Sequence, residues 1–196
     1  MEKRLLISIA LALFATGPGG CAGPEAKLTP LADAPELPMG ANICLDAKGE
    51  AMLVRGRILD TSGNPIPQAK IDVWQANDEG FYDVQQKGIQ PDFNLRGVFR
   101  TGPDGSYWFK GVKPKFYPIP DDGPVGDMLK ATKRHPWRPA HLHFLIKAPG
   151  YQTLITHVFR NGDQYLDSDA VFGVRESLIA DWLPQADGRY LVEFDF

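Results

Sequence analysis

The sequence predicts an all-β protein, an antiparallel β-sandwich with long loops and at most short helices. Its 20 glycines and 17 prolines stand in short clusters, which indicates many turns. Between the clusters lie runs of β-branched and aromatic residues, several of them alternating polar with apolar. No helical periodicity of useful length is present. With 196 residues, 43% of them hydrophobic, the chain is long enough for one packed domain and too short for two.

Residues 1–20 have the pattern of an export signal, in which basic residues precede an apolar run and then a small-residue stretch. The apolar run is too short to span a bilayer. Gly20-Cys21 resembles the end of a bacterial lipobox, so Cys21 is a candidate for lipidation and membrane anchoring. Pro18 stands where that motif has an aliphatic residue, which leaves plain secretion open. We therefore expect an exported protein: periplasmic, membrane-anchored or secreted.

Residues 21–50 are rich in proline, alanine and glycine, and we expect a tether followed by an arm on the domain surface. Residues 51–196 would then form the β-sandwich itself. Besides Cys21 the chain has one cysteine, Cys44, so an internal disulfide requires that Cys21 stays unmodified and pairs with it.

The strands follow from alternating or apolar runs between turn signals. A hairpin is predicted around Pro103-Asp104-Gly105, and a second around Pro149-Gly150. The last strand closes the sheet, and residues 169–183 have room for a short helix. The predicted strands are residues 53–59, 70–75, 97–101, 106–110, 140–147, 153–159 and 189–196.

Charge and fold class alone leave the function open. The net charge of -3 gives no electrostatic reason to expect a nucleic-acid partner. The pattern from Gly56 to Ile71 also resembles transthyretin-like and adhesin-type sandwiches, which bind ligands or form stalks. A secreted, non-catalytic binding module is therefore the alternative to an enzyme.

His141 and His143 form the most informative motif in the chain, within Arg138-Pro-Ala-His-Leu-His. Successive side chains of a strand point to opposite faces, so the two imidazoles share one face while Leu142 takes the other. Each ring can then present a nitrogen ~2 Å from a single metal ion. Two incidental histidines in a strand are the plainer interpretation of this motif alone.

Two tyrosines lie in loops, where a packing role is harder to argue. Tyr82 follows the predicted strand 70–75 closely, and Tyr117 stands in a proline-rich segment. On composition alone the other four tyrosines are equally good candidates: Tyr107, Tyr151, Tyr165 and Tyr190.

Four stretches, taken in their order along the chain, resemble the intradiol ring-cleavage dioxygenases. Within that family they look like the catalytic domain of hydroxyquinol 1,2-dioxygenases and catechol 1,2-dioxygenases. The resemblance runs from about Pro35 to the C-terminus. The stretches are Gly56 to Tyr82, the Tyr117-Pro-Ile-Pro loop, Arg138 to His143, and Thr156 to Gly173.

The resemblance implies a non-haem Fe(III) ion held by two tyrosinates and two histidines, which here are Tyr82, Tyr117, His141 and His143. Phenolate is a hard, anionic donor that suits Fe(III). A two-histidine, one-carboxylate site would need an acid in or after the His-x-His motif, and a cupin would need a glutamate within 144–150; the sequence has neither. A zinc hydrolase with His157 as third ligand stays open, although it leaves the tyrosines without a role.

The implied reaction is cleavage of a catechol-type ring with O2 to a cis,cis-muconate-type product. Tyr117 would leave the metal as a base, and Arg138 would stabilise negative charge that develops on the ring. His157 would hydrogen-bond near the metal or the substrate, although a strand histidine bonded to backbone is nearly as good an interpretation.

Four further residues are expected at the substrate. Ile119, Pro120 and Val171 match pocket-wall positions, and Asp83 follows Tyr82 closely enough to reach the site. The family's N-terminal helical domain, which forms its dimer interface and part of the pocket, has no counterpart among the matched motifs. The oligomeric state and the preferred substrate therefore stay open, and we expect a more open pocket.

Overall fold

The computed structural model describes residues 34–196. The predicted export signal, Cys21 and the first part of the tether lie outside these residues. Within the described part of the chain, no helix is both long and apolar enough to cross a membrane.

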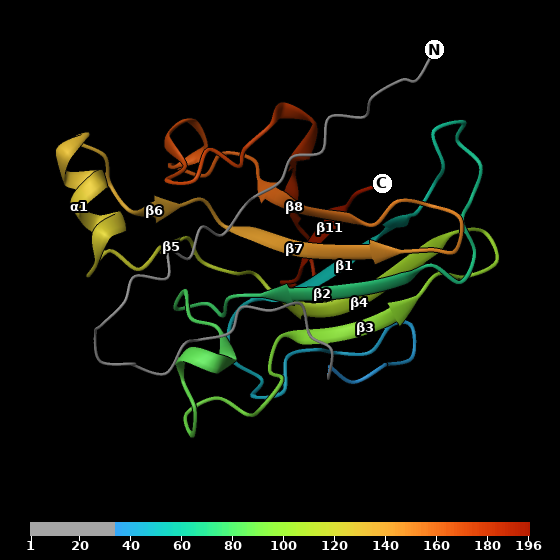
Figure 1. Ribbon diagram of the computed structural model, residues 1–196. Helices are drawn as coiled ribbons and strands as arrows, with labels where there is room; N and C mark the ends of the chain where they lie inside the picture. Colours follow the sequence, from blue (N-terminus) through green and yellow to red (C-terminus); the bar gives the residue numbers. More distant parts are fainter. Residues whose placement is uncertain (1–33) are drawn as a thin grey trace, which may run out of the picture.

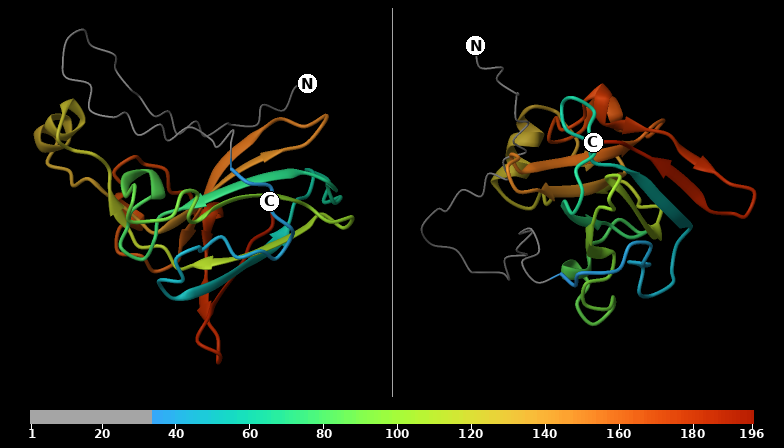
Figure 2. Two further views of the ribbon diagram at one scale, coloured as in Figure 1. Left: turned by 90° about the horizontal axis from the view of Figure 1, so that it is seen from below. Right: turned by 90° about the vertical axis from the view of Figure 1, so that its right-hand side faces the viewer.

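Two packed sheets form the molecule, and Figure 2 shows them as separate layers. The larger sheet has the strand order β3-β2-β7-β8-β9 and the smaller one β10-β11-β1-β4. A short ribbon of β5 and β6 lies with helix α1 at one end of the sandwich (Figure 1). The strands are β1 Ala51–Arg57, β2 Lys70–Gln75, β3 Arg96–Arg100, β4 Ser106–Val112, β5 Tyr117–Pro118, β6 Trp137–Arg138, β7 His141–Lys147, β8 Leu154–Arg160, β9 Ile179–Ala180, β10 Trp182–Pro184 and β11 Tyr190–Glu193.

The predicted β-sandwich is confirmed, with one correction: its sheets are mixed. β1 pairs with β4 in the antiparallel sense and with β11 in the parallel sense, and β8 pairs with β9 in the parallel sense. The alternation of side chains is the same in both kinds of ladder, so it does not report strand direction.

The expected hairpin around Pro103-Asp104-Gly105 is wrong, although both of its strands exist. The turn is tight, since the Gly102 amide donates to the Ser106 carbonyl at 2.8 Å. Its two arms, however, pair with different partners: β3 with β2 in one sheet, and β4 with β1 in the other. The turn is thus a corner between the layers. The hairpin around Pro149-Gly150 is confirmed as the β7–β8 pair.

The short helix expected within 169–183 is also absent. That region holds a single 3₁₀ turn, η3 (Glu176–Leu178), followed by β9 and β10. Within residues 34–196 the one α-helix lies elsewhere, as α1 (Pro124–Ala131), with proline in its first turn. It buries only Gly126 and Leu129, so its sequence lacks the repeated apolar positions that indicate an amphipathic helix.

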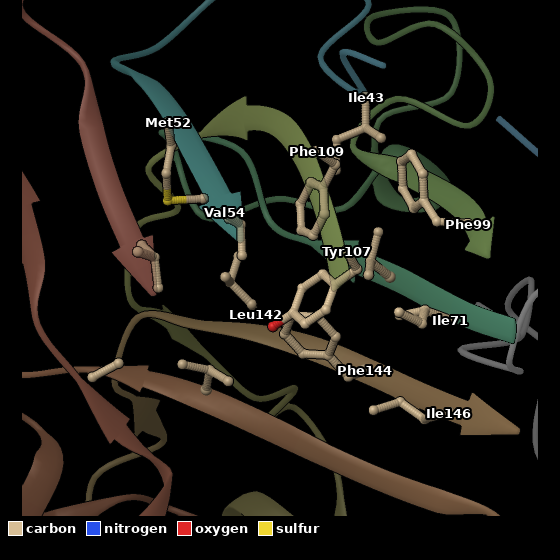
Figure 3. Close-up of a cluster of buried hydrophobic side chains, with 14 of the residues drawn as sticks. Ile43, Met52, Val54, Ile71, Phe99, Tyr107, Phe109, Leu142, Phe144 and Ile146 are labelled. Atoms are coloured by element: carbon tan, nitrogen blue, oxygen red, sulfur yellow. The ribbon is translucent and has the colours of Figure 1, made fainter. Parts of the chain in front are cut away.

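The hydrophobic core fills the space between the two sheets (Figure 3). Phe144 of β7 packs against Phe109 and Tyr107 of β4, with ring centroids 6.3 and 6.0 Å apart. Because Leu142, Phe144 and Ile146 face this core, His141 and His143 lie on the outer face of the same strand.

The arm expected on the surface is part of the sandwich. The Val98 amide of β3 donates to the carbonyl of Pro35, and the Ile43 amide donates to that of Lys110 in β4. Ile43 itself is 1% exposed and belongs to the core. The arm therefore contacts both sheets, and the compact domain begins before residue 51.

Candidate metal centre

Four donor atoms meet on the outer face of the larger sheet. The hydroxyl of Tyr82 lies 2.8 Å from that of Tyr117 and 2.8 Å from Nε2 of His143. Nε2 of His141 lies 3.1 Å from the Tyr117 hydroxyl and 3.1 Å from Nε2 of His143. The four atoms thus form a closed ring with edges of 2.8–3.1 Å, which we call the donor ring.

This ring fits a single metal ion. Two ligand atoms that each lie ~2 Å from an ion, at angles of about 90–110°, are ~2.8–3.3 Å apart. His141 also has the required tautomer, because its Nδ1 is 2.7 Å from the Pro139 carbonyl, which can only accept. Nε2 of His141 therefore carries no proton, and its lone pair is available to a metal ion held by the four donor atoms. The donor set, two oxygens that can become anionic and two imidazole nitrogens, suits a ferric ion.

Strand pairing positions the histidines. His141 and His143 stand two residues apart in β7, and His143 is opposite Trp74 of β2. The Trp74 ring stacks on that of His143, with centroids 4.7 Å apart and planes 8° from parallel. The stack fixes the orientation of the imidazole.

Tyr82 enters the site from the turn that follows β2. Asn77 shapes this turn by accepting the amides of Glu79 and Phe81 on its side-chain oxygen. The Tyr82 amide donates to Gln85 of the 3₁₀ turn η1 (Asp83–Gln85) at 2.8 Å. Tyr82 is 3% exposed, so its ring is held firmly under the centre.

Tyr117 comes from β5 and is brought next to Tyr82 by a glycine. Gly80 has a φ of +93°, and a Cβ there would lie 3.1 Å from the Phe116 carbonyl oxygen. A side chain at position 80 would therefore be both strained and crowded. The two loops approach because residue 80 has none, and Tyr117 stays half-buried.

Burial keeps Tyr82, His141 and His143 of this centre uncharged. Burial, together with the neighbouring Arg138 and His157, holds the pKa of His141 well below its usual range, and burial does the same for His143. Both imidazoles are therefore neutral and able to ligate. Burial and the adjacent Tyr117 raise the pKa of Tyr82 well above its usual value. The four groups alone give no reason for Tyr82 to ionise, whereas a cation between them would.

His157 of β8 lies beside this ring of donors. It is opposite His143 in the β7–β8 ladder, with ring centroids 4.6 Å apart. The three histidines can bring one nitrogen each to within 4.8 Å of one another. That spacing is looser than the 2.8–3.1 Å of the four-atom ring. The zinc alternative with three histidine ligands thus fits the structure less well.

Arg138 is also at the centre. It lies in β6, opposite Tyr117 of β5, and is 5% exposed. One of its nitrogens, Nη1, is 3.2 Å from Nε2 of His141. Although burial disfavours its charge, Tyr117 and Asp169 raise the pKa of Arg138. A fixed cation therefore faces the donor ring.

The four residues expected at the substrate do not share one environment. Asp83 does not use its carboxylate at the donor ring: it pairs with the buried Arg96 and accepts the Phe93 amide at 3.1 Å. Ile119, Pro120 and Val171 lie in loops, and Val171 is 40% exposed. Both loops run beside β6, since the Ile119 amide donates to the Pro136 carbonyl and the Ala170 amide to that of Trp137.

Two residues at the site were not singled out from the sequence. Trp74 stands in a predicted strand, but its stacking on His143 depends on the β2–β7 register. Asp169, which binds Arg138 with both carboxylate oxygens, is 31 residues away in the chain. No local pattern indicates either contact.

Comparison with known proteins identifies the family. A family model described as a dioxygenase matches residues 30–196. Hydroxyquinol 1,2-dioxygenase of Rhizobium sp. is 68% identical over 166 residues, which cover 85% of this chain and 56% of that protein. The chain belongs to the intradiol ring-cleavage dioxygenases. Enzymes of this family use non-haem iron.

Other intradiol dioxygenases give the same result. The 6-chlorohydroxyquinol 1,2-dioxygenase of Cupriavidus pinatubonensis is 56% identical over 163 residues, covering 83% of this chain and 59% of that protein. The solved hydroxyquinol 1,2-dioxygenase from Pseudomonas putida superposes with a TM-score of 0.77 at 40% identity, covering 98% of this chain and 67% of that one. The chain spans little more than half the length of the two curated relatives.

Proposed function

We propose that the protein is an Fe(III)-dependent intradiol dioxygenase that cleaves hydroxyquinol or catechol with O2 to a cis,cis-muconate-type product. The observation that carries the proposal is the closed ring of two phenol oxygens and two imidazole nitrogens with edges of 2.8–3.1 Å. A non-catalytic binding module has no need of such a ring. The names of the two curated relatives support hydroxyquinol as the first substrate to test.

Tyr82, Tyr117, His141 and His143 would hold the ferric ion. The bound ion would act as a Lewis acid and withdraw electron density from a chelating aromatic diolate.

The two tyrosines have different tasks in this proposal. Tyr117 is half-buried in a short ribbon, so its side chain is the less confined of the two and would be the one to move and accept a phenolic proton of the substrate. Tyr82 is 3% exposed and packed against Trp74 and Leu145, so it stays in place.

Arg138 and His157 would act on the substrate from the protein side. The Arg138 guanidinium offers a fixed positive charge next to the donor ring, where it stabilises negative charge on the aromatic ring. His157 is neutral and 7% exposed, and it would supply a hydrogen bond at the edge of the centre. Ile119, Pro120 and Val171 would line the pocket.

Oxygen uptake tests the proposal directly. The purified, iron-loaded protein should consume O2 with hydroxyquinol or catechol, and phenolate-to-iron charge transfer should colour it red to purple. Protocatechuate and chlorocatechols in the same panel would define the preferred ring substitution. A colourless protein that is fully occupied by another metal and consumes no O2 would refute the proposal.

We also propose that the protein is exported, either anchored to the membrane by a lipid on Cys21 or released without one. The support is the sequence pattern of residues 1–21. Fractionation of cells should place the mature protein in the periplasm or on the membrane, and Cys21→Ser should release it from the membrane. Full-length chain in the cytoplasm, with residues 1–20 intact, would contradict export.

A further inference from the structure

Arg138 is held by two hydrogen bonds to one buried carboxylate. Its Nε donates to Oδ1 of Asp169 at 3.0 Å, and its Nη2 donates to Oδ2 at 3.2 Å. The side chains of the pair are 6% and 2% exposed. A bidentate pair of this kind fixes the plane of the guanidinium as well as its position.

The geometry leaves one nitrogen for the donor ring. With Nε and Nη2 occupied by Asp169, Nη1 of Arg138 faces Nε2 of His141 at 3.2 Å. If Asp169 did not hold the other edge, the long side chain could rotate away from the ring.

Asp169 is itself fixed by the loop that carries Val171. Its Oδ2 accepts the Gly173 amide at 2.8 Å, and its Oδ1 lies 3.4 Å from the Val171 amide. On the other side, the Arg134 guanidinium donates to the carbonyls of Asp169 and Ala170, both at 3.0 Å. The carboxylate is therefore held in a preformed cradle.

Gly173 completes this cradle by leaving space. A Cβ at position 173 would lie 3.0 Å from Nη2 of Arg138 and 3.1 Å from Oδ2 of Asp169. Such contacts are tighter than ordinary packing, so a side chain there would push the pair apart.

We propose that Asp169 is a positioning residue, which holds Arg138 with one edge toward the reacting ring and links it to the loop of Val171. The inference rests on the proposed function, since it gives Arg138 its task. The Asp169 carboxylate contacts Arg138 and the amides of its own loop, and none of the four donor atoms. Its effect is on the placement of a charge, and misplacement by about 1 Å can cost ~10²-fold in rate.

Asp169→Asn tests the inference, because it keeps the shape and removes the charge. We expect full iron content, an unchanged visible band without substrate, and kcat lower by about 10²-fold. KM should stay the same, since the lost interaction acts in the transition state. In nitrogen-15 NMR of the metal-free protein, the Arg138 Nε–H should exchange slowly in the wild type and fast in the variant.

Asp72→Asn is the matched control. Asp72 is also a buried aspartate, 4% exposed, but it lies in β2 with Lys70 as its ionic neighbour at 3.6 Å. Neither kcat nor the Arg138 exchange rate should change in this variant.

Gly173→Ala is the second variant, because Asp169→Asn could prevent folding. It keeps both charges and should still lower kcat, to a smaller extent, and speed the Nε–H exchange while iron is retained. Unchanged kcat and exchange in this variant would overturn the inference, as would a fall in kcat in Asp169→Asn that only follows loss of iron.

Failure of the proposed function would be visible separately. If the wild-type protein consumes no O2 with any of the diols, that proposal falls. The exchange of the Arg138 Nε–H then decides by itself whether Asp169 holds the guanidinium.

Discussion

At the scale of single residues, two tyrosines with the same chemistry have different surroundings. Tyr82 is buried and follows a core strand, whereas Tyr117 is half-buried in a two-residue strand. The difference predicts that one phenolate is a permanent ligand and the other a base.

Tyr117→Phe should keep iron through Tyr82, His141 and His143, and should shift the visible band. Turnover should fall by about 10²–10⁴-fold, because the substrate loses a general base. Tyr82→Phe should instead weaken iron retention. Stopped-flow spectra under anaerobic conditions would check this, and an unchanged rate of substrate binding in Tyr117→Phe would show that Tyr117 is not the departing base.

His157 predicts a pH dependence of stability in the metal-free protein. Burial, and then the charge of Arg138, lower its pKa from 6.5 to about 3. Between these values the unfolded chain binds a proton that the folded one does not, so the free energy of unfolding falls as the pH drops from about 6.5 toward 3.

His157→Gln should make this dependence shallower by about 1.4 kcal/mol per pH unit in that window. His141 and His143 keep their own contributions of the same sign. Urea unfolding at several pH values would measure how the free energy of unfolding changes with pH. Identical pH dependences in wild type and variant would show that the pKa of His157 is not lowered by folding.

At the scale of elements, the turn that carries Tyr82 is fastened to the larger sheet. Asp83 of η1 pairs with Arg96 of β3, and their side chains are 7% and 2% exposed. Nη2 of Arg96 is buried without a hydrogen-bond partner among the described residues. The ion pair with Asp83 therefore carries most of the compensation for this buried charge.

Asp83→Asn should lower the free energy of unfolding by about 3–5 kcal/mol, because it leaves the Arg96 charge uncompensated. Urea denaturation would measure the change. Glu193→Gln is the matched control, since it breaks the exposed Arg55–Glu193 pair of the other sheet and should cost no more than ~1 kcal/mol. Equal losses in both variants would contradict the structural role of Asp83.

At the scale of the whole molecule, the donor ring joins segments that are distant in the chain. Tyr82 comes from the turn after β2, Tyr117 from β5, and the histidines from β7. A bound ion would tie these segments together only in the folded state, so metal binding and folding should be linked.

Removal of iron should therefore lower the Tm. At a free metal concentration 1,000 times the dissociation constant, binding raises the free energy of unfolding by about 4 kcal/mol. Calorimetry with and without a chelator would measure the shift, and His143→Ala should show the same Tm in both conditions. An iron-independent Tm in the wild type would contradict the predicted link.

The sequence by itself determined what depends on neighbouring residues. Most strands lie within a few residues of their predicted bounds, because alternation and turn residues are local signals. His141 and His143 share a face for the same reason. The family resemblance added Tyr82 and Tyr117, which no spacing rule would have selected from six tyrosines.

Only the tertiary structure decided which segments meet. β3 and β4 joined different sheets, and β11 lies parallel to β1, because ladder partners are chosen by packing across the whole core. The pairing of Arg138 with Asp169, the bond from Asp83 to Arg96 and the place of His157 beside His143 have the same origin. A local pattern fixes the face to which a side chain points, whereas its partner depends on register and topology.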